Sequence, residues 1–237
     1  MNTTKYKMLV LDLDDTLLRD DYSISERTIN ALIATQQMGV KVVLASGRPT
    51  LAMTQYAKML QQHNFDSYMI SFNGAVVSST RTNEVIFETS LTQSEIHSLY
   101  DFSVEHGVHI ITYSDKGIVS ETHSEYIDVE LKLTGIPHYK VPSFKDEVSY
   151  SAIKCILLEH PDYLKQVELV LKSQRTDLSV SRSKPFFLEV MPKGIDKAAS
   201  LDMLAKKLGY TSEQIIAVGN AGNDLSMIQY AGVGVWV

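Results

Sequence analysis

The 237-residue sequence predicts an α/β fold in which a doubly wound, Rossmann-like parallel sheet carries an inserted α/β domain. Short β-like runs alternate with helical stretches in the first part of the chain. The pattern changes in character from about Arg81, and the last part returns to the first rhythm. We therefore expect a core made of residues 1–81 together with 187–237, and an insertion over 82–186.

Two runs in the first part have the composition of strands that are covered on both faces. Met8–Leu13 is apolar nearly throughout, and Lys41–Ala45 is rich in β-branched residues. Between them, Ser23 with Glu26 three residues later predicts the start of a helix, and Gly39 predicts its end. Strand, helix and strand in this order are typical of a parallel sheet.

The rest of the first part continues the alternation. Pro49 predicts the first turn of another helix. Tyr68–Phe72 and Ala75–Ser78 have the composition of two further strands, separated by the turn pair Asn73-Gly74.

The insertion and the last part have their own predicted elements. Thr92 with Glu95 forms a second capping-box signature, which begins a helix that ends before Gly107. The other elements expected after it are a hairpin of Val108–Tyr113 and Gly117–Ser120, helices over 122–134, Asp162–Ser173, Asp196–Leu208 and Asn223–Tyr230, and strands over Ala152–Leu158, Leu178–Arg182, Phe186–Val190 and Ile215–Val218. Because the chain stops inside the apolar run Gly232–Val237, we expect that the polypeptide continues beyond it.

The composition excludes several classes of protein. A net charge of -6 gives no general attraction to nucleic acid or to an anionic membrane, so local cations would have to capture an anionic substrate. No apolar stretch approaches the roughly 20 residues that cross a bilayer. The single cysteine, Cys155, excludes an internal disulfide and is typical of a reducing compartment. We predict a cytoplasmic protein in which Cys155 is a buried strand residue; a reactive thiol is the alternative.

The most informative segment comes after the first predicted strand and runs DLDDTL from Asp12 to Leu17. Because alternate residues of a strand point the same way, Asp12 and Asp14 are expected to project together at its carboxyl end, where open α/β sheets bind ligands. Two carboxylates there repel one another unless a cation or a proton offsets them, and Mg²⁺ accepts such oxygens. A single aspartate could merely cap a turn, but this pair after an apolar strand favours a metal-assisted site.

Two cationic groups are expected at the same edge of the sheet. Ser46, Gly47 and Arg48 come after the second strand, and a hydroxyl, an unhindered amide and a guanidinium suit phosphate oxygens. Lys197 lies in the first turn of a predicted helix, where a lysine is unfavourable against the helix dipole and where anions bind. Ordinary loop chemistry at Ser46-Gly47 and a solvated surface lysine are the alternatives.

A fourth segment, GNAGND from Gly219 to Asp224, comes after the strand Ile215–Val218. It brings Asp224 and two side-chain amides to the edge where further metal or phosphate contacts are needed.

In order and spacing, these four segments resemble the four motifs of the haloacid dehalogenase superfamily. The large α/β insertion between Ser46 and Lys197, together with the FNGA stretch from Phe72 to Ala75, resembles its Cof-like sugar-phosphatase branch. The similarity covers essentially the whole chain, and the first and last motifs are specific in combination.

The resemblance implies a role for each matching residue. Asp12 would be the nucleophile that forms an aspartyl phosphate, and Asp14 would act as general acid and then as general base. The expected phosphate-binding residues are Ser46, Gly47 and Arg48 of the loop described above, together with Lys197 and Asn223. A Mg²⁺ ion would be held by Asp12, the backbone carbonyl of Asp14, Asn220 and Asp224. The family usually has an aspartate at position 220, so a negative charge is missing and weaker Mg²⁺ binding is expected.

These features predict a Mg²⁺-dependent phosphatase that acts on a small phosphorylated metabolite such as a sugar phosphate. The insertion would act as a cap that excludes water and contacts the non-phosphate part of the substrate. Two alternatives remain open. One is a sugar phosphomutase of the same superfamily, and the other is a phosphate-binding protein with degraded catalysis, which Asn220 and the short end of the chain suggest. The sequence carries no signal for an oligomeric state.

Overall fold

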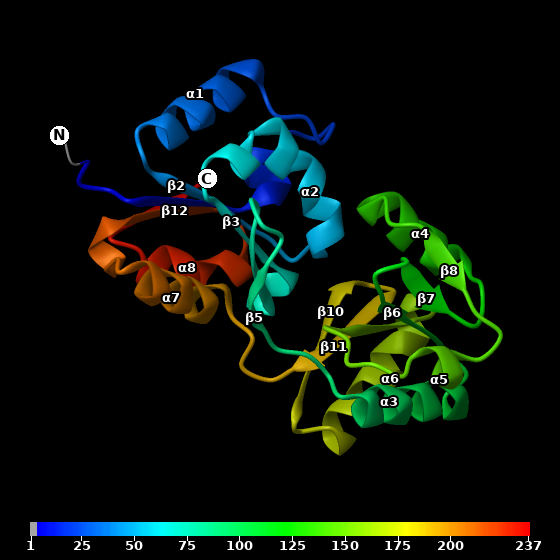
Figure 1. The fold of residues 1–237 in the computed structure, drawn as a ribbon. Helices are drawn as coiled ribbons and strands as arrows, with labels where there is room; N and C mark the ends of the chain where they lie inside the picture. Colours follow the sequence, from blue (N-terminus) through cyan, green and yellow to red (C-terminus); the bar gives the residue numbers. More distant parts are fainter. Residues whose placement is uncertain (1–3) are drawn as a thin grey trace. The chain divides into compact units, whose positions relative to one another are not determined.

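The computed structural model describes residues 4–237, and the chain divides into two units. Among the described residues, one unit consists of 4–88 with Ile195–Val237, and the other of Thr89–Gly194. Figure 1 shows that each unit has a β-sheet of its own with helices packed beside it.

The first unit is built on a seven-stranded sheet with the order β13-β12-β1-β2-β3-β4-β5. Neighbouring strands from β13 to β3 are parallel, whereas β4 and β5 are antiparallel additions at one edge. This arrangement confirms the predicted α/β class. The strands are β1 (Met8–Leu11), β2 (Lys41–Ala45), β3 (Tyr68–Ser71), β4 (Val76–Ser79), β5 (Val85–Glu88), β12 (Ile215–Gly219) and β13 (Val233–Trp236).

Helices cover both faces of this sheet because alternate strand residues point in opposite directions. On one face Leu44 of β2 packs in a cluster with residues of α1 (Glu26–Gln37) and α2 (Thr50–Met59). On the other face Val43 of β2 packs in a cluster with residues of α7 (Lys197–Leu208) and α8 (Leu225–Tyr230). The carboxyl ends of the parallel strands are thereby left as the edge where polar side chains can gather.

One predicted helix start is wrong. Ser25, and not Ser23, is the N-terminal cap of α1, and its hydroxyl accepts a hydrogen bond from the amide of Thr28 at 3.1 Å. The amide of Ser23 donates instead to Asp21 in the preceding turn at 3.0 Å. Both serines suit a cap, but only the nearer hydroxyl reaches a free amide of the first helical turn.

The second unit contains a six-stranded sheet with the order β10-β11-β9-β6-β7-β8. Its neighbouring strands are antiparallel except for β7 and β8. The elements are α3 (Gln93–Glu105), β6 (His109–Tyr113), β7 (Ile118–Ser120), α4 (Glu125–Thr134), β8 (His138–Lys140), α5 (Phe144–Glu147), β9 (Cys155–Leu158), α6 (Pro161–Gln174), β10 (Leu178–Lys184) and β11 (Phe187–Pro192). The capping box of Thr92 and Glu95 at the start of α3 is present as predicted.

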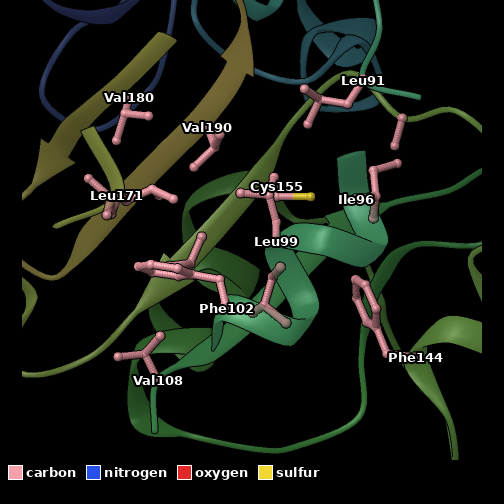
Figure 2. Packing of buried hydrophobic residues seen from close by; sticks show 14 of the residues in the cluster. Leu91, Ile96, Leu99, Phe102, Val108, Phe144, Cys155, Leu171, Val180 and Val190 are labelled. Atoms are coloured by element: carbon pink, nitrogen blue, oxygen red, sulfur yellow. The ribbon is translucent and has the colours of Figure 1, made fainter. Parts of the chain in front are cut away.

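A hydrophobic core of its own stabilises the second unit. Figure 2 shows Leu99 and Phe102 of α3 and Leu171 of α6 in the same cluster as Cys155 and Val190 of the sheet. Cys155 has no exposed surface, and burial raises the pKa of its thiol to about 12. The prediction of a buried strand cysteine is confirmed, and an ionised, reactive thiol is not expected there.

Strand pairing places both boundaries between the two units later in the chain than expected, after Glu88 instead of residue 81 and after Gly194 instead of residue 186. Residues 82–88 include β5, which pairs with β4 of the first sheet, and residues 187–194 include β11, which pairs with β9 and β10 of the second. The sequence did not indicate β5, β8 or α5, all of which are four residues or shorter. No helix among residues 4–237 has the length and apolar character needed to span a membrane.

Candidate active site

The ends of three parallel strands bring the predicted site segments together in the first unit. Asp12 comes directly after β1, and its amide donates to the carbonyl of Val218 on β12 at 3.0 Å. Ser46 comes directly after β2, and its amide donates to the carbonyl of Ile70 on β3 at 2.9 Å. Because these strands are parallel neighbours, their carboxyl ends form one edge, as expected for a ligand site of an open α/β sheet.

Lys197 connects two aspartates at this edge. Its side chain is completely buried. Its ammonium donates to Oδ1 of Asp12 at 2.8 Å, to Oδ1 of Asp224 at 2.5 Å and to the carbonyl of Ala45 at 3.0 Å. The three donors of the ammonium therefore have three acceptors. We call Asp12, Lys197 and Asp224 the Lys197 cluster.

The charges of the Lys197 cluster do not balance. Two ionised carboxylates and one ammonium would leave a net charge of about -1 in a buried place, which is costly without a further cation. Burial raises the pKa of Asp12 above its ordinary value, the ammonium of Lys197 opposes this, and the negative charge of Asp224 adds to it. The cluster thus favours the approach of a positive ion or a proton.

Asp224 also holds the loop on which it lies. Its Oδ2 accepts hydrogen bonds from the amides of Asn220 at 3.1 Å and Ala221 at 3.0 Å. At Gly219, where β12 ends, a Cβ atom would lie 2.6 Å from the Cβ of Asp224, so a larger residue would displace the aspartate. The contacts of Asp224 therefore fix both the loop and the lysine.

Asp14 and Arg48 form a second ion pair. The guanidinium Nε lies 2.9 Å from Oδ2 of Asp14, and the Nη2 atom lies 2.5 Å from Oδ1. The rings of Tyr22 and Tyr56 lie 5.2 and 5.7 Å from the guanidinium carbon, a distance typical of cation–π contacts. The hydrogen bond with Asp14 raises the pKa of Arg48. Arg48, predicted as a phosphate ligand, is thus engaged by the predicted acid–base group.

The remaining predicted residues lie in the two loops of this edge. Ser46 is buried, and its hydroxyl accepts a hydrogen bond from the amide of Arg48 at 3.2 Å. A Cβ atom at Gly47 would lie 3.2 Å from the carboxamide of Asn73, so the two loops approach closely there. Asn223 is exposed and donates to Asn73 at 2.9 Å. The sequence indicates Asn73 as a turn residue and as part of the FNGA stretch, but neither signal indicates its contact with Asn223.

The donor set at this edge suits a hard cation with few protein ligands. Residues 4–237 contain no group of three or more histidine, cysteine, aspartate or glutamate side chains arranged to hold a metal ion. However, Mg²⁺ keeps several waters and needs only one or two carboxylates beside its phosphate ligand. The two buried carboxylates of the Lys197 cluster, which carry more negative charge than the lysine offsets, fit that requirement.

Comparison with known proteins identifies the class to which this fold and site belong. The profile of the haloacid dehalogenase-like hydrolases matches residues 9–237. The chain therefore belongs to this family, which confirms the resemblance inferred from the four motifs.

Individual relatives agree with this assignment. The chain is 34% identical over 236 residues to the putative phosphatase YxeH of Bacillus subtilis (strain 168), covering 97% of this chain and 86% of YxeH. A crystal structure of a haloacid dehalogenase-like hydrolase from Bacteroides thetaiotaomicron has a TM-score of 0.93 and 35% identity, covering 97% of this chain and 87% of that one. A HAD subclass IIB sugar phosphatase has a TM-score of 0.75 and 26% identity, covering 95% and 85% of the two chains. The family and the names of such relatives support a phosphatase enzyme.

Proposed function

We propose that this protein is a Mg²⁺-dependent phosphatase that hydrolyses small phosphorylated metabolites through an aspartyl phosphate on Asp12. One observation carries the proposal. Lys197, from a helix that begins 185 residues after Asp12, directs its buried ammonium at the carboxylate that would react. A fixed cation beside a buried carboxylate is suited to a reaction in which negative charge accumulates on phosphoryl oxygens.

In the first step, a carboxylate oxygen of Asp12 attacks the phosphorus atom. The bond between phosphorus and the leaving-group oxygen breaks, and that oxygen takes a proton from Asp14. In the second step, Asp14 accepts a proton from water, whose oxygen attacks phosphorus and releases the Asp12 carboxylate and inorganic phosphate. Splitting one displacement into two in this way is typical of nucleophilic catalysis.

The ion pair between Arg48 and Asp14 affects both steps, because each step needs the carboxyl group of Asp14. Asp14 is 47% exposed and holds both a guanidinium Nε and Nη2, so Arg48 must release Asp14 before that carboxyl group can serve the leaving group. A phosphate anion is a competing bidentate partner for a guanidinium. Substrate binding would therefore transfer Arg48 from Asp14 to the phosphate.

Other residues of the edge would bind and orient the phosphate. Lys197 would counter the charge on the phosphoryl oxygens, while Ser46, the amide of Gly47 and Asn223 would donate hydrogen bonds to them. Asp12, the backbone carbonyl of Asp14, Asn220 and Asp224 would hold the metal ion. When bound, Mg²⁺ would supply further positive charge at the transferring group.

A sugar phosphate is the substrate class that we favour. A related structure is described as a sugar phosphatase. The second unit, Thr89–Gly194, would then act as the cap that contacts the sugar. A cytoplasmic location is the one that we favour, because a single cysteine forms no internal disulfide.

The test measures release of inorganic phosphate from a generic aryl phosphate, with Mg²⁺ and then with EDTA. Asp12→Asn removes the nucleophilic charge and should lower turnover below detection, and EDTA should do the same to the wild-type protein. Asp15→Asn is the matched control, because Asp15 is exposed, and it should retain activity. Turnover by the Asp12→Asn variant at the wild-type rate would exclude the aspartyl-phosphate mechanism.

A further inference from the structure

The turn Phe72–Gly74, between the antiparallel strands β3 and β4, has an unusual backbone. Its three residues have φ angles of +51°, +57° and +108°. Left-handed backbone is rare for residues with a Cβ atom, and such strain persists only where surrounding contacts impose it. Asparagine and glycine tolerate the conformation, but phenylalanine does not favour it. The contacts that hold this turn in its left-handed conformation therefore indicate its role in the structure.

One set of contacts joins the turn to the loop after β2. The amide of Phe72 donates to the carbonyl of Arg48 at 3.0 Å, and the amide of Asn73 donates to the carbonyl of Ser46 at 3.0 Å. Both acceptors belong to the loop that we assign to phosphate binding.

A second set joins the turn to α7. The hydroxyl of Ser200 donates to the carbonyl of Gly74 at 2.6 Å. A Cβ atom at Gly74 would lie 2.6 Å from the carbonyl oxygen of Asp196, so this position has no room for a side chain. The turn is thereby fixed to the first turns of the helix that carries Lys197.

The side chain of Asn73 makes the third connection. Its Oδ1 accepts a hydrogen bond from Nδ2 of Asn223 at 2.9 Å. Its carboxamide atoms also lie 3.2 Å from the place that a Cβ atom would take on Gly47. One side chain thus touches two segments that reach the proposed site from opposite ends of the chain.

We propose that Asn73 is a positioning residue of the phosphate site. Its carboxamide oxygen holds one N–H of Asn223, which directs the second N–H to the phosphate, since a primary amide has two donors. Its packing against Gly47 keeps the backbone of that loop in the orientation that its amide needs. The proposal rests on the proposed function, because the anion that these donors bind is the phosphate of the substrate.

A purely structural role for Asn73 predicts a different outcome. If asparagine were needed only for the left-handed backbone, glycine would serve equally well, because it adopts positive φ without steric cost. Asn73→Gly therefore preserves the turn and removes the carboxamide. Asn83 offers a matched control, since it is an exposed asparagine with φ of +58° in the turn between β4 and β5.

The experiment measures binding of inorganic phosphate by calorimetry in the presence of Mg²⁺, together with kcat and KM for an aryl phosphate. Asn73→Gly should raise the Kd for phosphate and the KM about tenfold, while kcat changes much less, because the lost hydrogen bond orients a ligand of both ground state and transition state. Asn83→Gly should leave all three values unchanged. Unchanged phosphate binding in Asn73→Gly would overturn the proposal.

A double-mutant cycle tests whether Asn73 acts through Asn223. The losses of phosphate affinity in Asn73→Gly and Asn223→Ala should add to clearly more than the loss in the double variant Asn73→Gly/Asn223→Ala, because both single changes remove the same hydrogen bond, and fully additive losses would overturn the proposal. The cycle is read from binding alone, so it stays informative if Asp12→Asn shows that the proposed mechanism is wrong. Conversely, an additive cycle beside turnover that requires Asp12 would remove only the role of Asn73. A wild-type protein that binds no phosphate would contradict both.

Discussion

Each of the two units buries a lysine beside carboxylates, and the two lysines are held in different ways. In the first unit, Lys197 is completely buried and donates to Asp12, to Asp224 and to a backbone carbonyl. In the second unit, the Lys154 side chain is 4% exposed, donates to Glu189 at 3.0 Å and lies 5.6 Å from the ring centre of Tyr113.

The two groups differ in where their members come from. Asp12 comes after a parallel strand, Asp224 lies in the loop after another, and Lys197 begins a helix, so the Lys197 cluster gathers at an edge of its sheet. Lys154 directly precedes β9, whereas Glu189 lies on the neighbouring strand β11 and Tyr113 on β6. A buried ion pair between adjacent strands contributes packing and register, whereas one at the ends of parallel strands can meet a ligand. Burial of a charge alone therefore does not mark a site.

The largest effect should result from the loss of Lys197. Lys197→Met leaves two buried carboxylates without their cation, so we expect kcat to fall at least about a hundredfold and the free energy of unfolding to fall by about 3–5 kcal/mol. Phosphate release from an aryl phosphate gives kcat, and urea unfolding monitored by circular dichroism gives stability. Lys207→Met, an exposed lysine at the other end of α7, should change neither. Retention of more than a tenth of kcat in Lys197→Met would remove Lys197 from the chemistry.

Loss of Lys154 should affect stability alone. Lys154→Met leaves Glu189 without its ammonium partner, so the free energy of unfolding should fall by about 3 kcal/mol, while kcat of the folded protein should stay within about threefold. Replacing both partners, in Lys154→Met/Glu189→Met, should recover part of the stability, because the uncompensated charge of Glu189 is then removed. If Lys154→Met lowered kcat as strongly as Lys197→Met, the distinction between the two lysines would be wrong.

The sequence predicted which residues gather at the carboxyl ends of the parallel strands in the first unit. The apolar runs before Asp12 and Ser46 identified parallel strands, and parallel strands bring the residues at their carboxyl ends to one edge. A lysine in the first turn of a helix opposes the helix dipole, and this local conflict indicated that Lys197 has a role other than helix formation. In the structure that lysine contacts Asp12 directly. The metal and phosphate roles of these residues stay predictions.

The sequence could not predict which side chains of distant segments pair with one another. Nothing in the order of residues couples Asp14 to Arg48, 34 positions later, or Asn73 to Asn223, 150 positions later. Such pairs depend on which rotamers the folded backbone allows. Short edge strands such as β5 were missed for a related reason, because its half-exposed residues acquire strand structure only by pairing with β4.

The smallest expected effect concerns Glu130 of α4, which accepts a hydrogen bond from the hydroxyl of Tyr113 at 2.6 Å. Burial raises the pKa of Glu130, although the charge of Lys154 and the bond from Tyr113 oppose this. Between the unfolded pKa and this higher folded pKa, the folded protein keeps a proton that the unfolded chain has lost. Glu130 therefore lowers stability as the pH rises through that window, with a slope of at most about 1.4 kcal/mol per pH unit.

Glu130→Gln keeps the oxygen that accepts from Tyr113 but cannot ionise. The free energy of unfolding of this variant, relative to wild type, should therefore increase as the pH rises above about 4, the ordinary pKa of a glutamate, as measured by urea unfolding at a series of pH values. Glu125→Gln, at an exposed position of the same helix, should match the wild-type profile. An equal profile for Glu130→Gln and wild type would mean that the charge of Lys154 and the hydrogen bond from Tyr113 offset the whole cost of burying the ionised Glu130. The buried charges of the second unit would then be balanced, in contrast to the Lys197 cluster, in which two carboxylates face one ammonium.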